Sequence, residues 1–200
     1  MKKIFFLCVM ALVAIGFTAC SSDDDNNSGD NKETMANPET PTDGSKILVA
    51  YFSWSGSTRA VANRIAQLTG GTLYEIQPAT PYTTNYQELA YTVARNELNT
   101  DARPALKETD ADFSNYDYVF LGCPVWWQTA PMIMSTFCEN YSFNGKTVIP
   151  FCTYASAGRD ATLQKLNSLT STANHLTGFG TSGSNTSGVE SWLKSINMIK

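Results

Sequence analysis

Apolar and polar positions follow two alternating patterns along this chain. Residues 47–52 are continuously apolar, which is typical of a parallel strand buried on both faces. Residues 59–68 then carry apolar side chains at helical spacing, and Gly70 and Gly71 end that helix. The same succession recurs toward the C-terminus. We expect strands at 47–52, 72–76, 116–122, 147–152 and 175–179, and helices at 59–68, 86–98, 131–137, 160–169 and 187–199.

Strands that alternate with helices predict an α/β fold, a parallel sheet with helices on both of its faces. Residues 45–200 are long enough to form one such domain with a sizeable core. Its last helix should open with a capping box between Ser187 and Glu190. Ligands of such sheets bind beyond the carboxyl ends of the strands. The loops that follow the strands are therefore the candidate functional site.

The loop after the first strand consists mainly of small and hydroxyl-bearing residues. Its members are Ser53, Trp54, Ser55, Gly56, Ser57 and Thr58. A strand, a loop of this composition and a helix N-terminus together favour a phosphate site, because free N–H groups and the helix dipole attract an anion. An ordinary helix N-cap would use the same residue types. The loop has neither G-x-x-x-x-G-K-[ST] nor G-x-G-x-x-G, so a single phosphate monoester fits better than a nucleotide polyphosphate or dinucleotide.

In these residues the chain resembles the flavodoxin family. The resemblance covers about residues 45–200, with Ala50 as a departure where a bulkier residue is usual. It is carried by Tyr51, Ser53, Gly56, Thr58, Ala62 and Ile65, and by a second motif, GCPVWW, at 122–127. The resemblance implies a flavodoxin-like, doubly wound sheet of five parallel strands in the order 2-1-3-4-5. It also implies a bound FMN, whose single phosphate agrees with the loop composition.

Two further loops are candidates for contact with the flavin ring. After the third strand come Pro124, Val125, Trp126 and Trp127. Two adjacent tryptophans either cover the core or place one indole against a planar cofactor, and the resemblance favours the second interpretation without saying which indole stacks. After the fourth strand, Tyr154 is a candidate for the other face or the edge of the ring. Small residues up to Gly158 would let backbone N–H groups approach the ring.

The remaining reactive side chains give no catalytic or metal centre. Cys123, Cys138 and Cys152 have no C-x-x-C spacing and are expected to be buried thiols, with a disulfide or redox-active pair of Cys123 and Cys152 as the alternative. His175 stands alone in a weak strand, so we assign neither a catalytic triad nor a metal site.

The N-terminal residues predict an export signal and a tether. Lys2 and Lys3 precede a short apolar run, and the segment ends in a sequence that resembles a bacterial lipobox, with Cys20 as the acylated residue. The alternative is an ordinary secretory signal. Residues 20–44 are polar and predict a flexible tether. We therefore expect a lipid-anchored protein of the cell envelope, at the outer membrane; the acidic run at 21–25 fits either a surface-export signal or a solvated spacer.

Charge is unevenly distributed between tether and domain. Residues 20–44 hold seven acidic residues and one basic residue, whereas residues 45–200 hold eleven of each. Flavodoxins are typically acidic and dock on basic partners, so this domain is expected to have a different partner. We expect electron transfer with a redox partner protein, or reduction of a small acceptor such as a quinone with NAD(P)H or another carrier as donor, and no nucleic-acid partner. The alternative is an FMN-free binding or scaffolding module of the envelope.

Overall fold

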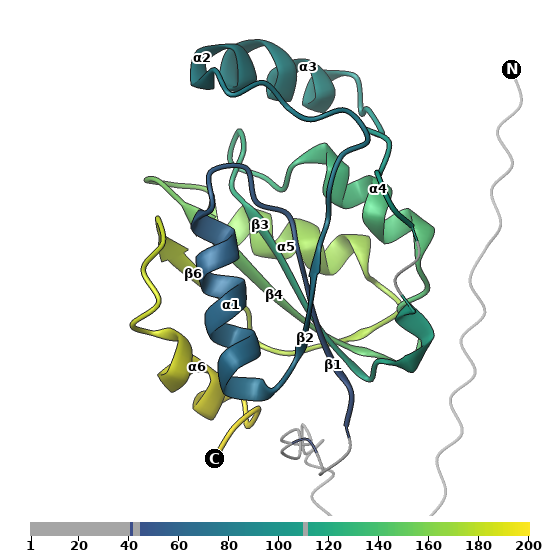
Figure 1. Cartoon of the computed structure of the whole chain (residues 1–200), viewed down its shortest axis with the longest axis vertical. Helices are drawn as coiled ribbons and strands as arrows, with labels where there is room; N and C mark the ends of the chain where they lie inside the picture. Colours follow the sequence, from purple (N-terminus) through teal and green to yellow (C-terminus); the bar gives the residue numbers. More distant parts are fainter. Residues whose placement is uncertain (1–40, 42–44, 110–111) are drawn as a thin grey trace, which may run out of the picture. The chain divides into compact units, whose positions relative to one another are not determined.

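A parallel β-sheet forms the centre of the domain (Figure 1). The computed structural model describes residues 41, 45–109 and 112–200. The predicted signal peptide and Cys20 lie outside the described residues, as does almost all of the predicted tether. The strands are β1 (Ile47–Tyr51), β2 (Thr72–Glu75), β3 (Tyr118–Pro124), β4 (Thr147–Tyr154), β5 (Asn174–His175) and β6 (Phe179–Ser182). Their order is β2-β1-β3-β4-β5, all pairs are parallel, and the predicted order 2-1-3-4-5 is confirmed.

The fifth strand differs from the prediction because it is interrupted. The predicted strand at 175–179 is replaced by β5 and β6, which both pair with β4 but are separated by residues 176–178. Pro150 lies on β4 between the two paired segments and has no N–H to donate. A Cβ on Gly178 would also lie 2.8 Å from the carbonyl oxygen of Pro150. The ladder therefore breaks opposite the proline.

Two apolar layers hold the helices to the sheet. On one face, α1 (Ser57–Thr69) and α6 (Val189–Ser195) pack on β-strand residues such as Val49 and Phe120. On the other face, α4 (Met132–Asn140) and α5 (Arg159–Leu169) pack on residues such as Leu121. These side chains are almost completely removed from water, so both faces of the sheet are core, as the continuous apolar strands predict. No helix among the described residues is both long and apolar enough to span a bilayer.

The ends of two helices test the capping predictions. The first helix ends at Gly70, which has a φ of +71° and donates its N–H to the carbonyl of Ala66, as predicted. The predicted capping box of the last helix is wrong. That helix begins at Val189 after Gly188 and has no side-chain cap. The N–H of Ser187, which Glu190 would accept in a capping box, donates to the side chain of Asn185 at 3.0 Å instead.

The helix predicted at 86–98 is present but is not a uniform α-helix. It consists of α2 (Tyr86–Glu88), a π-helical turn η1 (Leu89–Val93) and α3 (Ala94–Asn99), and a short 3₁₀ turn, η2 (Phe113–Asn115), precedes β3. The side chain of Asn85 begins α2 by accepting the N–H groups of Gln87 and Glu88. Figure 1 shows α2 and α3 beyond the carboxyl ends of β1 and β3, above the sheet rather than against its face. This placement sets one wall of the site.

Candidate functional site

The loop between β1 and α1 is organised by the hydroxyl of Ser53. Its Oγ accepts the N–H groups of Gly56 and Arg59, each at 3.2 Å. These two bonds hold the backbone in a tight turn around the side chain, with Gly56 at a φ of +91°, which favours glycine. Ser53 Oγ is the acceptor in both bonds, so its hydroxyl hydrogen takes no part in them. Ser53 therefore shapes the loop and can still donate one hydrogen bond.

The remaining donors of this loop gather at the N-terminus of α1. The first N–H groups of a helix have no partner within the helix. Among the described residues, the N–H groups of Ser57 and Thr58 have no acceptor, and the hydroxyls of Ser55 and Ser57 lie 3.3 Å apart. The loop thus places backbone and hydroxyl donors at the positive end of a helix dipole. This set of donors suits an oxyanion with several acceptor oxygens.

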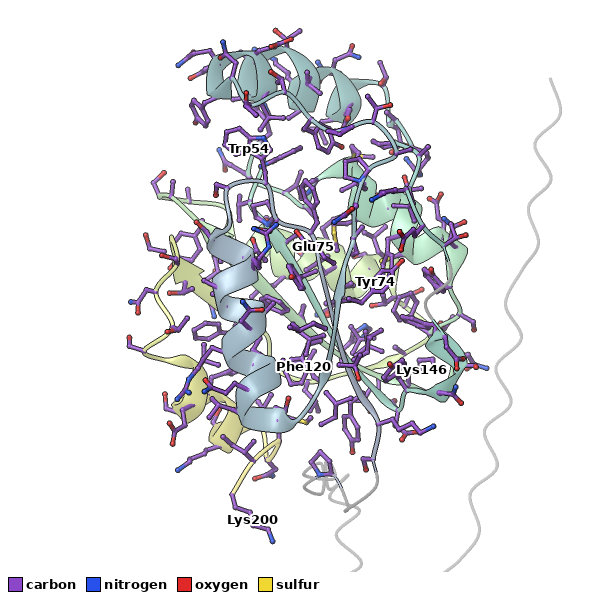
Figure 2. All side chains as sticks on the ribbon, viewed as in Figure 1. Trp54, Tyr74, Glu75, Phe120, Lys146 and Lys200 are labelled. Atoms are coloured by element: carbon purple, nitrogen blue, oxygen red, sulfur yellow. The ribbon has the colours of Figure 1, made fainter. Side chains whose placement is uncertain are left out.

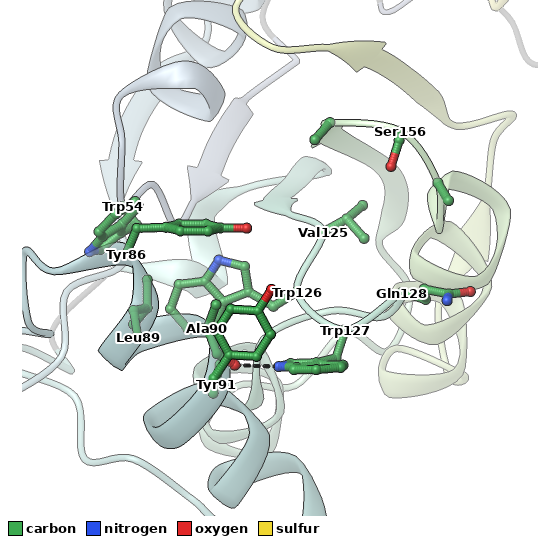
Figure 3. A pocket seen from close by; sticks show the side chains of 13 residues that line it. Trp54, Tyr86, Leu89, Ala90, Tyr91, Val125, Trp126, Trp127, Gln128 and Ser156 are labelled. Atoms are coloured by element: carbon green, nitrogen blue, oxygen red, sulfur yellow. Dashed lines mark hydrogen bonds between the residues drawn. The ribbon is translucent and has the colours of Figure 1, made fainter.

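A cavity of about 320 Å³ lies beside the loop, at the carboxyl edge of the sheet (Figure 3). Three separate loops and the segment from α2 to α3 line it. The lining residues are Trp54, Tyr86, Leu89, Ala90, Tyr91, Ala94, Val125, Trp126, Trp127, Gln128, Ala155, Ser156 and Ala157. Trp54 belongs both to this cavity and to the hydroxyl-rich loop, and its indole N–H donates to the carbonyl of Thr83 at 2.9 Å. The cavity therefore adjoins the loop at Trp54.

The two adjacent tryptophans occupy different surroundings. Trp126 is half-buried and meets the rings of Phe52 and Tyr82 edge-on, with centroids 5.4 and 5.2 Å away. Trp127 is 40% exposed, and its indole N–H donates to the carbonyl of Ala90 at 2.6 Å, the dashed bond in Figure 3. Trp126 therefore packs on the core, whereas Trp127 lies at the rim of the cavity.

The turn that carries Trp127 has an unusual backbone. The N–H and carbonyl groups of Trp126 and Thr129 bond each other at 2.9 and 3.0 Å, and the two residues between them have positive φ values. Trp127 has a φ of +48° and Gln128 a φ of +61°. Two positive φ values at the centre of a tight hairpin are typical of a type I′ turn, which usually contains asparagine and glycine. Residues other than glycine are strained in this backbone conformation. Surrounding contacts, such as the hydrogen bond from the Trp127 indole to Ala90, must therefore stabilise the turn.

The loop after β4 approaches the tryptophan loop very closely. A Cβ on Gly158, whose φ is +88°, would lie 2.6 Å from Cγ1 of Val125 and 2.7 Å from Cα of Gln128. Ala155, Ser156 and Ala157 reach the cavity instead of Tyr154, which lies at the end of β4 beside Ser182. Among the predicted site residues, Pro124 and Tyr154 end their strands outside the cavity lining, and Gly158 supports it from behind.

The segment from α2 to α3 supplies cavity residues that the sequence reasoning missed. Tyr86 and Tyr91 are 60% and 57% exposed, and Tyr91 meets Trp127 edge-on at 5.9 Å. Figure 3 shows the ring of Tyr86 extending from the side of Trp54 across the cavity. Two aromatic residues on the polar side of an amphipathic helix are a signal that could have identified this wall. A π-helical turn at a cavity wall is typical of functional sites.

The three domain cysteines are free and buried, as predicted. Cys123 and Cys152 are paired in register on β3 and β4. Burial raises the pKa of the Cys123 thiol well above its usual range and that of Cys152 to about 12, so both are neutral thiols at physiological pH. No metal-binding group of three or more His, Cys, Asp or Glu residues occurs in the part of the chain that the structure describes.

Comparison with known proteins relates this chain to flavodoxins. The family model for flavodoxin matches residues 46–196. A solved flavoprotein from Bacteroides uniformis ATCC 8492 is 36% identical, with a TM-score of 0.69, and the match covers 76% of this chain and 99% of that one. A flavoprotein from Bacteroides eggerthii DSM 20697 matches with the same identity and TM-score and is covered to 98%.

A more distant structure shares the fold. It is a flavoprotein from Lactobacillus acidophilus NCFM in complex with FMN, with 23% identity, a TM-score of 0.61, and coverage of 74% of this chain and 98% of that one. No curated protein matches the chain.

Proposed function

This chain is a member of the flavodoxin family, and from that premise we propose that it binds one FMN and transfers electrons through it. The observation that carries the proposal is that two different surfaces adjoin at Trp54. A loop of phosphate-type donors adjoins an aromatic cavity, and Trp54 belongs to both. A ligand with an anionic end and a flat apolar end fits this combination. FMN has this form.

The residues present fit the cofactor at both ends. The N–H groups of Ser57 and Thr58 and the hydroxyls of Ser55 and Ser57 would hold the phosphate, since these donors have no strong acceptor within the described residues. The rings of Trp54, Tyr86 and Trp127 would flank the planar ring system and exclude water from it. When bound, FMN supplies the capacity to accept and release electrons and hydride, and the protein supplies binding, orientation and the surrounding polarity.

Backbone geometry around the cavity supports close approach to the ring edge. Ala155, Ser156 and Ala157 have small side chains, so their backbone groups can reach polar atoms of a ring in the cavity. The exposed rim at Tyr91 and Trp127 leaves one edge of the cavity accessible from solvent. Electrons would enter and leave through this edge.

The redox partner or electron acceptor of this domain is an extension of the same proposal. The domain has equal numbers of acidic and basic residues, so it lacks the strong charge that steers a typical flavodoxin to a basic partner. A redox partner with a neutral face, or a small planar acceptor such as a quinone reduced at the expense of NAD(P)H or another carrier, suits this domain better. The aromatic rim would favour such a planar, apolar acceptor.

Membrane tethering through Cys20 completes the proposal. If Cys20 is acylated at a lipobox, the polar segment 20–44 would link the domain to the outer membrane. The variant Cys20→Ser should then move the protein from the membrane fraction to a soluble fraction of the envelope without changing its flavin content. Wild-type protein found wholly soluble, with its N-terminus at another residue, would contradict the tether but not the flavin site.

The test of FMN binding is an absorbance spectrum of the purified protein, followed by titration with FMN and riboflavin. We expect a flavin spectrum and a preference for FMN. The variant Gly56→Val should abolish that preference, because it disturbs the loop at a positive φ. Gly145→Val is the matched control, since Gly145 has a φ of +75° and open space around its Cβ position. A protein that stays colourless in excess FMN would contradict the proposal and favour an FMN-free binding or scaffolding module.

A further inference from the structure

Arg59 holds a cation over the loop at the start of α1. Its Nη1 atom lies 3.7 Å from the position that a Cβ on Gly56 would occupy, so the guanidinium overhangs the tightest point of the turn. Its own N–H is bound by Ser53 at 3.2 Å, which fixes the backbone from which the side chain extends. The chain therefore adds a positive charge to a loop whose other donors are neutral.

A carboxylate on the neighbouring strand holds this guanidinium in one orientation. Nε of Arg59 donates to Oε2 of Glu75 at 3.1 Å, and Nη2 forms an ion pair with the other carboxylate oxygen. The hydroxyl of Tyr51 donates to the same Oε2 atom at 3.3 Å. Glu75 thus engages the Nε and Nη2 edge of the guanidinium, and Tyr51 also interacts with it, while no hydrogen bond from Nη1 occurs within the described residues. Figure 2 shows Glu75 close to the N-terminal end of α1.

Stability of the fold is a weak explanation for this arrangement. The side chain of Arg59 is 46% exposed and that of Glu75 is 24% exposed, and ion pairs this accessible contribute little to folding. A guanidinium that is already oriented loses less freedom when it binds an oxyanion. The Nη1 edge of Arg59 lies near Gly56, in the same loop as the neutral donors.

We propose that Arg59 is a direct, charged ligand of the phosphate in this site, with its guanidinium oriented by Glu75. The inference rests on the proposed FMN function. It adds that part of the affinity is electrostatic and specific for the phosphate, so the protein should separate FMN from riboflavin more strongly than neutral donors alone would allow. It also makes FMN binding sensitive to salt.

The experiment compares FMN and riboflavin affinity in three variants of the full chain. Arg59→Gln should weaken FMN about fivefold to tenfold, which is the effect of one partly exposed charge-assisted hydrogen bond, and should leave riboflavin affinity unchanged within about twofold. Arg59→Lys keeps the charge and should recover part of the loss. Added salt should weaken FMN binding less in Arg59→Gln than in wild type.

Arg64→Gln is the matched control. Arg64 lies on the same helix and also loses an exposed ion pair, with Glu190 at 3.3 Å, but it is remote from the loop. We expect unchanged FMN affinity for this variant and thermal midpoints similar to those of Arg59→Gln. Equal weakening of FMN and riboflavin by Arg59→Gln, or no weakening of FMN, would overturn the assignment while leaving the flavin site intact. A wild-type protein that binds neither ligand would instead remove the proposed function, and the inference with it.

Discussion

The hydroxyl oxygens of Thr58 and Thr153 lie 2.8 Å apart in the interior of the domain. Thr58 belongs to the first turn of α1 and is 1% exposed, and Thr153 lies near the end of β4 and is 3% exposed. The bond therefore joins the loop after β1 to β4, and β3 lies between these two strands in the sheet. It fixes the distance between the loop and the residues after β4 that line the cavity.

This pair should show strong coupling in folding stability. Thr153→Val leaves the Thr58 hydroxyl buried without its partner, so we expect a loss of about 1–3 kcal/mol in the free energy of unfolding. Replacing both threonines by valine removes both polar groups and should cost less than the sum of the two single changes. Urea unfolding of the four proteins without flavin measures the coupling. Strictly additive losses would mean that the bond contributes nothing.

Gly158 should be far less replaceable than a glycine with similar backbone angles elsewhere. In Gly145→Ala only the positive φ is unfavourable, because no atom lies within 4 Å of the added Cβ, and we expect a loss of about 1 kcal/mol. In Gly158→Ala the new Cβ also clashes with Val125 and Gln128. We therefore expect a further loss of about 1–3 kcal/mol in the free energy of unfolding, and weaker FMN binding. Thermal unfolding and FMN titration report the two effects. Similar losses in both variants would contradict the close contact between the two loops.

Truncation should affect stability more at Trp126 and FMN affinity more at Trp127. Trp126→Ala removes a half-buried ring that packs on Phe52 and Tyr82, so we expect a loss of about 2–4 kcal/mol in stability. Trp127→Ala removes a ring at the exposed rim and should change stability less, but weaken FMN by a few-fold to about tenfold. Quenching of tryptophan fluorescence by FMN should be smaller in the Trp127 variant. If both variants lose stability and keep their FMN affinity, neither indole stacks on the flavin.

The positions of the central strands could be predicted from their long buried runs, whereas the order of the sheet came from the resemblance to flavodoxins. β1, β3 and β4 are apolar over most of their length, and each overlaps the run that predicts it. The fifth strand could not be placed correctly, because its interruption is caused by Pro150 on a different strand. The π-helical turn could not be predicted either, since the apolar spacing of Leu89 and Val93 suits an α-helix equally well.

The site was predictable only in the parts that follow strands directly. Trp54, Val125, Trp126 and Trp127 line the cavity because the carboxyl ends of parallel strands meet at one edge of the sheet. The contribution of Tyr86 and Tyr91 depends on how a whole helical segment is placed above the sheet, which local patterns do not determine. Thr153 looks like an ordinary strand residue, and only the folded structure brings it to Thr58.

His175 should make stability depend on pH. Its Nε2 lies 2.9 Å from Oγ1 of Thr170, whose hydroxyl is also bonded to the carbonyl of Leu166. Burial lowers the pKa of His175 in the folded state. The unfolded chain therefore takes up its proton first, and stability is full above the unfolded pKa of about 6.5 and falls as the pH drops below it. Urea unfolding at several pH values should show a smaller decline in His175→Gln, and parallel curves for both proteins would contradict this.

Cys123 and Cys152 lie side by side on β3 and β4, so thiol labelling can test whether they are free thiols or a disulfide. Both side chains are fully buried and their pKa values are raised by that burial, so neither presents a thiolate to reagents in solution. In the folded protein at pH 8 we expect both thiols to stay unlabelled by a soluble alkylating reagent, and in urea we expect both to react fully, as mapped by mass spectrometry of peptides. Rapid labelling of the folded protein would contradict the burial of these thiols. A peptide pair joined through Cys123 and Cys152 without added oxidant would instead support the disulfide interpretation and place a second redox centre beside the proposed flavin.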